Sequence, residues 1–290
     1  MSTTHTLSPT DSGSVTTTSD GVARLTFPRV VRSEWIKFRT LRSTIWALAV
    51  MVVLMVGVAM LFALAMKSAV DNGQNLADSG VTGPVIVTGG YYFGQLTLIV
   101  LGVLVITGEY STGMIRSTFA AVPKRLPALW GKALVLAVTA FVVSAISLGL
   151  SWIATRAMLT PLHLTADFSD GETTRIIVGA ALYLTLMSLL ALACGALLRS
   201  SAAALAVVLG LVLVVENVFQ IISLAWVKNI GAFLPSTAGA RIMMPQSQID
   251  SLAQGSTAPQ LAPWEGLGVL GLWVVVLLVV AAVLIKRRDA

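Results

Sequence analysis

Few residues in this 290-residue chain have side chains suited to catalysis or metal binding. The two histidines, His5 and His163, are far apart in the sequence, and Cys194 stands alone in an apolar run. Zinc sites are built from His and Cys clusters at short spacings, such as HExxH, and the sequence contains no such cluster. We therefore expect no metal site, no catalytic residues and no cofactor held by this chain.

Two glycine motifs have the spacing of nucleotide-binding loops but lack the rest of the pattern. The stretch Gly266–Gly271 fits GxGxxG, yet it opens a long apolar run and does not follow a strand. The stretch Gly108–Gly113 has the glycine spacing of a P-loop, but Met114 and Ile115 follow where that loop carries Lys and Ser or Thr. The lysine that binds phosphate is therefore missing, and we predict that the chain is not an ATPase or any other enzyme.

The remaining candidate for chemistry is the carboxyl group of Glu216, the one charge in the apolar run 200–227. An ionisable group at membrane depth is costly and marks a candidate functional site. Glu216 lies about 24 Å along a helix from Ser200, toward the far end of that run. Two interpretations stay open: an intramembrane polar site, or a carboxyl group that bonds to a neighbouring helix.

The elements that must position these residues are long apolar runs. Hydrophobic residues make up 56% of the chain and charged residues only 11%, whereas soluble domains carry about 25% charged residues. A helix that crosses a bilayer needs about 20 residues, and the runs do not alternate apolar and polar residues as barrel strands would. We therefore predict an all-α, polytopic membrane protein with six transmembrane helices. The expected spans are 44–66, 91–108, 133–155, 176–198, 202–225 and 266–285.

The distribution of positive charge predicts the orientation of these spans. Six spans put both termini on one side of the membrane. If that side is cytoplasmic, all but five of the 19 Lys and Arg residues lie on it, as the positive-inside rule requires. The exceptions are Lys67, Arg156, Arg175, Lys228 and Arg241. The net charge of +6 thus follows membrane topology, and we expect a cell-membrane protein with cytoplasmic termini and no nucleic-acid partner.

Two segments precede the first span. Residues 1–28 are rich in Ser and Thr and predict a disordered cytoplasmic tail. Residues 29–43 predict an amphipathic interface helix that rests in the lipid headgroup layer. Its apolar stripe is expected to comprise Val31, Trp35, Phe38 and Leu41. Its candidate functional residues are Arg32, Glu34, Trp35, Lys37 and Arg39.

The loop 107–125 is the largest internal segment on the predicted cytoplasmic side. Glu109 directly follows a span, and a short helix is expected near 112–121, ahead of Pro123. Ser111 or Thr112 is the expected N-cap of that helix. This pattern is typical of a compact docking surface, although a plain connector between two spans has a similar composition.

Two segments resemble the ABC-2 type permease subunits of bacterial ABC transporters, especially those of actinobacteria. They are RSEWIKFRTLRSTIW at 32–46 and ITGEYSTGMIRSTFAAVPKR at 106–125, and the terminal LIKRRDA is similar to the ends of those subunits. The resemblance covers residues 29–290.

This resemblance implies specific roles for the two segments. It implies that 29–43 is the interface helix of the family and that 44–290 is its six-helix transmembrane domain. It also implies that the first cytoplasmic loop couples the membrane helices to a separately encoded nucleotide-binding ATPase subunit, which binds ATP and Mg²⁺. The expected coupling residues are Glu109, Tyr110, Ser111, Thr112, Gly113, Met114 and Arg116. A second permease copy, in a homodimer, is the other implied partner besides the lipid membrane.

The leading hypothesis is therefore a permease subunit of an ATP-driven exporter. An ion-coupled secondary transporter that uses Glu216 is the first alternative. A membrane anchor or immunity-type protein that only recruits a partner would have the same helices and docking loop. A membrane-embedded enzyme is disfavoured because no paired acids, metal ligands or nucleophile are placed along a span.

Overall fold

The structure of the protein, a computed structural model, describes residues 26–74, 81–121, 125–222, 224–255 and 259–287. Most of the tail predicted at 1–28 lies outside the described residues. The first helix, α1 (Phe27–Thr40), already begins two residues before the expected interface helix. Pro28 stands in its first turn, where a missing amide hydrogen removes no helical bond.

The regular secondary structure of the described residues is helical throughout, which confirms the predicted fold class. Within the described residues, six helical segments are long and apolar enough to cross a membrane. They comprise Arg42–Asp71, Gly83–Ser111, Leu126–Leu162, Gly171–Leu198, Ser201–Ile221 and Pro263–Arg287.

Three of these segments are single helices: α2 (Arg42–Asp71), α7 (Gly171–Leu198) and α13 (Pro263–Arg287). The second segment contains α3 (Gly83–Thr88) and α4 (Tyr91–Ser111), and the third contains α6 (Leu126–Leu159) with a 3₁₀ turn at Thr160–Leu162. The fifth comprises α8 (Ser201–Leu209), a π-helical stretch Gly210–Val215 and α9 (Glu216–Ile221). The connections hold α5 (Met114–Ala121), α10 (Ala225–Gly231), α11 (Pro235–Ala240), a 3₁₀ turn Arg241–Met243 and α12 (Gln246–Gly255).

Helix α7 is the centre of the bundle. It packs against α4, α6 and α13. Of its most apolar 18-residue stretch, 67% is buried within the protein, whereas the corresponding value for α2 is 22%. A Cβ atom at Gly102 of α4 would collide with the carbonyl oxygen of Ser188 on α7, so the two helices meet backbone to backbone there. Small residues permit such close approach between membrane helices. The exposed apolar side chains of α2, α8 and α13 are left outside the core of this chain.

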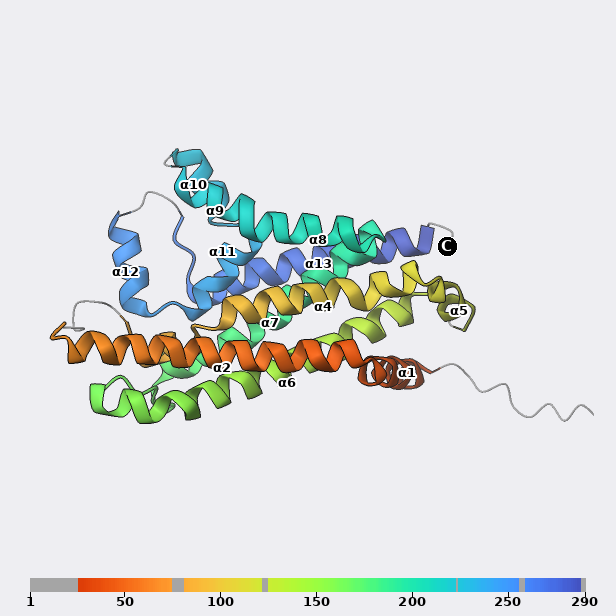
Figure 1. Cartoon of the computed structure of the whole chain (residues 1–290). Coiled ribbons are helices and arrows are strands. Elements are labelled where there is room, and N and C mark those ends of the chain that lie inside the picture. The colour runs from red at the N-terminus through yellow and green to blue at the C-terminus, as the bar shows by residue number, and fades with distance from the viewer. Residues whose placement is uncertain (1–25, 75–80, 122–124, 223, 256–258, 288–290) are drawn as a thin grey trace, which may run out of the picture.

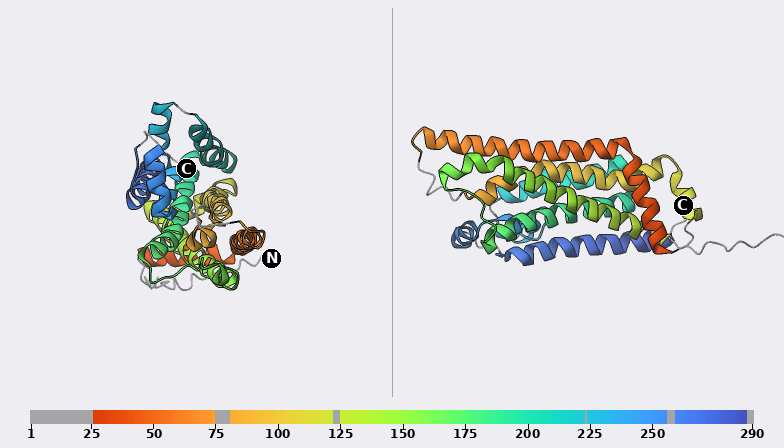
Figure 2. Two further views of the ribbon diagram at one scale, coloured as in Figure 1. Left: turned by 90° about the vertical axis from the view of Figure 1, so that its left-hand side faces the viewer. Right: turned by 90° about the horizontal axis from the view of Figure 1, so that it is seen from below.

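Helix α1 lies crosswise at one end of the bundle, almost perpendicular to α2, and α5 lies at the same end (Figures 1 and 2). The end of α13 reaches this region as well (Figure 1). Helices α10 and α12 lie at the opposite end. The predicted interface helix and the predicted coupling loop therefore share one end of the protein.

The segment after the fifth span turns back into the bundle. Helix α11 packs against α13 and α7, and Ala238 is fully buried. The span predicted at 202–225 extends past the observed helix, which ends at Ile221 because Ile222 adopts an extended backbone. The apolar sequence continues beyond Ile221, so a prediction from hydropathy placed the end of this span at residue 225.

Candidate functional site

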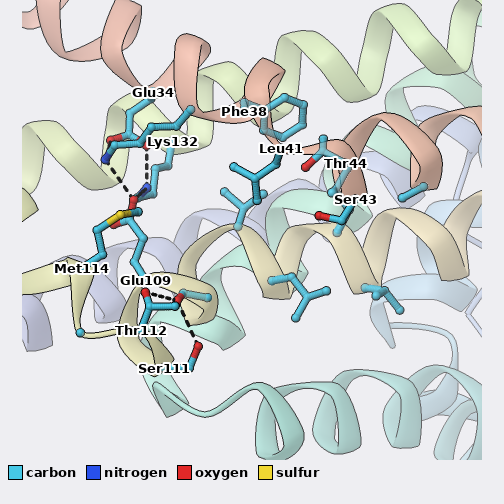
Figure 3. A pocket seen from close by; sticks show the side chains of 18 residues that line it. Glu34, Phe38, Leu41, Ser43, Thr44, Glu109, Ser111, Thr112, Met114 and Lys132 are labelled. Carbon is cyan, nitrogen blue, oxygen red and sulfur yellow. Dashed lines mark hydrogen bonds and ion pairs between the residues drawn. The ribbon is translucent and has the colours of Figure 1, made fainter.

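Four charged side chains meet where α1 crosses the ends of α4 and α6, and we call them the charge cluster: Glu34, Lys37, Glu109 and Lys132. Lys132 Nζ of α6 donates to Glu34 Oε2 of α1 at 2.5 Å and to Glu109 Oε1 of α4 at 2.6 Å. Lys37 Nζ donates to Glu34 Oε1 at 2.9 Å and to Glu109 Oε1 at 3.0 Å. Figure 3 shows Glu34, Glu109 and Lys132 pointing toward one another from three separate helices.

The charge cluster is buried and electrically balanced. Glu34, Glu109 and Lys132 are each about 5% exposed, while Lys37 is half-buried. Burying a charge without a partner is expensive, so two carboxylates require two ammonium groups at this position. The cluster therefore holds α1 rigidly on the bundle, and loss of any one member leaves an unbalanced buried charge.

Helix α5 is connected to the same cluster. The hydroxyl of Thr118 donates to Glu109 Oε2 at 3.3 Å, and Lys37 Nζ lies 3.4 Å from that hydroxyl oxygen. Four helices, α1, α4, α5 and α6, thus meet at two lysines and two glutamates. These bonds tie α1 and α5 to the ends of α4 and α6.

Lys37 stays charged over the whole physiological range. Burial works against its positive charge, but hydrogen bonds and ion pairs with Glu34 and Glu109 outweigh burial and raise the pKa of the Lys37 ammonium. The stabilisation that this group provides is present below its ordinary pKa of 10.5 and is lost only as the pH rises through the raised value.

The buried face of α1 differs from the predicted stripe. Its buried residues are Val30, Glu34 and Phe38, whereas Trp35 is 43% exposed and Leu41 is also exposed. Of the expected stripe, only Phe38 lies in the core. The stripe was expected to face the lipid headgroups, which contacts within the protein do not test. The face of α1 that packs on the bundle carries Glu34, which its lysine partners stabilise there. Arg32 and Arg39 are exposed, as are the ring of Trp35 and the side chain of Ile36.

The predicted coupling residues divide between two helices. Glu109, Tyr110 and Ser111 form the last turn of α4, so Glu109 belongs to a membrane helix and not to a loop. Thr112 and Gly113 make the turn, with Gly113 at a φ of 72° that favours glycine. Met114 and Arg116 are exposed on α5.

The expected N-cap at Ser111 or Thr112 is wrong. Both hydroxyls donate to the carbonyl of Gly108, at 3.0 and 2.8 Å, and therefore complete the end of α4. The Gly108 carbonyl also accepts the Thr112 amide at 3.2 Å, so both hydroxyls add to a bond that already closes α4.

An open cavity of about 710 Å³ lies beside the charge cluster, between α1, α2 and α4. Its polar end includes Glu109, Ser111 and Thr112, and its apolar part includes Phe38 and Leu41 (Figure 3). Any shift of α1 or α4 changes the shape of this cavity, because the charge cluster forms part of its wall.

A second polar cluster lies far from the first and contains Gln95, Tyr183, Glu216, Ser236 and Thr237. Glu216 accepts hydrogen bonds from the Ser236 amide at 2.9 Å and the Thr237 hydroxyl at 2.8 Å, at the start of α11. The Tyr183 hydroxyl donates to Gln95 Oε1 at 2.8 Å and lies 2.9 Å from Ser236 Oγ. Glu216 and Gln95 are buried, so the cluster fixes α11 to α4, α7 and α9.

Sequence reasoning missed Lys132 as a site residue and did not connect Gln95 or Tyr183 with Glu216. Lys132 stands at the edge of an apolar run and resembles an ordinary boundary charge. No sequence signal separates it from such a charge. The structure begins α6 at Leu126, which places Lys132 about two turns inside that helix.

No group of three His, Cys, Asp or Glu side chains that could hold a metal ion occurs within the residues that the structure describes.

A family model described as "ABC-2 family transporter protein" matches residues 29–290. No curated protein sequence matches the chain.

Proposed function

From the premise that this chain belongs to the ABC-2 family of transporter proteins, we propose that it is the permease subunit of an ATP-driven exporter powered by separate ATPase subunits. The family match and six apolar helices make the chain a multi-pass membrane transport permease. The direction of transport, the partner and the energy source belong to the proposal.

The charge cluster is the observation that carries this proposal. An ATPase that drives transport from outside the membrane must move membrane helices through a rigid contact. Helices α1 and α5 lie at one end of the bundle, and their side chains bond to α4 and α6. Movement of an ATPase against α5 then shifts α4 and α6 together, because the buried bonds do not stretch or slide freely.

In the proposed mechanism, the membrane helices of two paired permease copies switch between two packings. The cavity that the two copies share then opens to one side of the membrane or to the other. ATP and Mg²⁺ bind to the partner subunits, and this chain holds neither. The partner shifts the balance only if it binds the two packings with different affinity. The expected contact residues are Tyr110, Ser111, Thr112, Met114 and Arg116, around the turn at Gly113.

The proposed complex contains two copies of this chain in the plasma membrane, with both termini in the cytoplasm. The charge distribution supports this orientation, since the end that carries α1 and α5 is rich in Lys and Arg. The exposed apolar faces of α2 and α8 provide surface for both lipid and a second copy.

Reconstitution tests the proposal directly. The full chain is placed in proteoliposomes alone, with its ATPase subunit, and with that subunit plus a non-hydrolysable nucleotide. We expect uphill export only with the ATPase and hydrolysable ATP, and we expect Glu109→Ala to abolish stimulation of ATP hydrolysis. Uphill transport by the chain alone would favour the ion-coupled carrier, whereas ATPase recruitment without any transport would favour a membrane anchor.

A further inference from the structure

Arg116 and Arg199 line a small pocket beside the turn at Gly113, and neither has a carboxylate partner among the residues that the structure describes. The pocket has a volume of about 330 Å³ and is lined by Tyr110, Gly113, Ile115, Arg116 and Arg199. Arg116 lies on α5 in the first connection at this end of the bundle, and Arg199 lies in the second, between α7 and α8. The pocket is therefore built jointly by two connections that are far apart in the sequence.

The charge of this pocket is not balanced by its own walls. Two of its lining residues are arginines and none is acidic. Across the described part of the chain, neither arginine side chain has an ion pair. Glu109, the acidic residue adjacent to Tyr110, is already bonded to Lys37, Lys132 and Thr118.

One of the two arginines, Arg199, is held in place by neighbouring groups. Arg199 lies over the ring of Tyr110, with its Cζ atom 5.4 Å from the ring centroid, in a cation–π contact. Its backbone closes α7 in the left-handed region, with φ of 54° and a bond from its amide to the Gly195 carbonyl at 2.9 Å. The carbonyl end of a helix attracts a cation. Arg199 is thus ordered in advance, so little conformational entropy is lost when a ligand binds its guanidinium.

The Tyr110 side chain, whose ring packs under Arg199, also carries a polar group without a partner. The hydroxyl of Tyr110 is buried and has no hydrogen-bond partner within the described residues. Buried polar groups usually have partners, and an exception requires an explanation. Arginine guanidinium groups are donors that suit a carboxylate or a phosphate oxygen, and both arginines belong to the lining of this pocket.

We propose that this pocket receives an acidic side chain, Asp or Glu, from the ATPase subunit, and that Arg116 and Arg199 are its joint recognition site. This inference rests on the proposed function. A protein carboxylate is favoured over a lipid phosphate because every lining residue belongs to a connection or to the last turn before one, and the first of these connections is the proposed docking surface. The second connection, which sequence analysis left without a role, then takes part in docking.

The test uses the full chain co-expressed with the ATPase subunit of the same transporter, identified by its P-loop peptide and its ATP hydrolysis. Arg116→Glu and Arg199→Glu reverse the two charges, and Arg287→Glu reverses an exposed arginine at the same end of the bundle, outside the pocket. We expect each pocket variant to weaken retention of the ATPase by about 30-fold or more, and Arg287→Glu to leave it unchanged.

Two further measurements make the result decisive. An Asp→Arg and Glu→Arg scan of the ATPase surface should include one variant that restores binding to Arg199→Glu. Arg116→Gln, at an exposed position on α5, removes the charge without reversing it and should weaken binding less than Arg116→Glu. Thermal unfolding of each variant in lipid verifies that the bundle is intact.

The outcomes separate this inference from the proposed function. If wild-type chain retains the ATPase and both pocket variants retain it equally well, the inference is overturned while the proposed function stands. If wild-type chain retains no ATPase, both fail. If the variants keep the ATPase but lose co-purified phosphatidylglycerol, measured by mass spectrometry, the occupant is a lipid phosphate and the proposed protein contact is rejected.

Discussion

Glu34 and Lys132 are 98 residues apart in the sequence, and Lys132 Nζ lies 2.5 Å from Glu34 Oε2 in the structure. The bond joins a helix that crosses the end of the bundle to the third membrane segment. Both side chains are buried, so neither can exchange its partner for water. The position of α1 relative to α6 is therefore fixed by an ion pair that the helix sequences alone do not specify.

Replacing Lys132 by methionine should destabilise the protein more than most single substitutions. Two buried carboxylates would then share Lys37 alone, and loss of one member of a buried ion pair costs about 3–5 kcal/mol. Thermal unfolding in lipid nanodiscs measures the effect, with Lys286→Met at an exposed position as the matched control. An equal melting temperature for both variants would contradict a structural role of the charge cluster.

The close contact between α4 and α7 predicts opposite effects for two glycines. Gly102→Ala forces a methyl group against the Ser188 carbonyl and should cost about 1–3 kcal/mol. Gly149→Ala on α6 meets no atom within 4 Å and should be neutral or stabilising by up to about 1 kcal/mol. Unfolding of the two variants under identical conditions tests the prediction, which fails if Gly102→Ala is the more stable of the two.

Two substitutions of Glu216 test whether its carboxyl group is structural or carries protons. Glu216→Gln keeps one acceptor oxygen for the Ser236 amide or the Thr237 hydroxyl, and we expect transport to persist. Glu216→Ala removes both acceptors and should release the start of α11, with loss of transport. The exposed Gln220→Ala serves as the control. Abolition of flux by Glu216→Gln, together with loss of any pH-gradient dependence, would instead support the ion-coupled carrier.

The N-terminus of α7 carries a pH-sensitive cap. Backbone hydrogen bonds from Thr173 and Glu172 lower the pKa of the Asp170 carboxyl below its ordinary value of 3.8. Because the folded pKa is the lower one, the stabilisation is complete above pH 3.8 and disappears as the pH falls through the folded value.

Asp170→Ala should therefore lower the melting temperature at pH 7, and the difference from wild type should narrow toward pH 3. Asp170→Asn should lose little at neutral pH, since asparagine is also a good N-cap. The measurement is thermal unfolding across this pH range. A difference that stays constant with pH would mean that the charged form of Asp170 is not what stabilises α7.

Cysteine labelling tests the proposed orientation. In a Cys194→Ala background, Ser117→Cys on α5 and Ser251→Cys on α12 introduce single thiols at exposed positions on opposite ends of the protein. A membrane-impermeant maleimide applied to intact cells should label Ser251→Cys alone, and both after the cells are opened. Labelling of Ser117→Cys on intact cells would reverse the topology and remove the basis for a cytoplasmic partner.

The membrane architecture was predictable because its cause is local in sequence. Apolar runs between charges such as Arg42 and Lys67 are long enough to cross a bilayer as helices. A helix satisfies all its backbone hydrogen bonds internally, which a segment in lipid requires. The prediction needed only the length and composition of each run. The helices extend past the lipid-sized ranges, as α6 does at Leu126, because a helix continues until backbone geometry or a turn residue ends it.

The contacts within the candidate site were not predictable because they join distant parts of the chain. Nothing near Glu34 in the sequence indicates that Lys132 will approach it, and an amphipathic pattern assigns Glu34 to the exposed face. Likewise, Glu216 finds its partners at the start of α11, whose return into the bundle depends on packing against α7 and α13. Such pairings are determined by tertiary packing.

The π-helical stretch Gly210–Val215 places Glu216 at a particular angle around the axis of its span. A π turn contains about one residue more than an α turn, and each residue corresponds to about 100° of rotation. Rewinding this stretch into regular α geometry would swing the carboxylate through roughly that angle and away from Ser236. The bonds between Glu216 and the start of α11 therefore depend on the π geometry of the fifth span as well as on the residue itself.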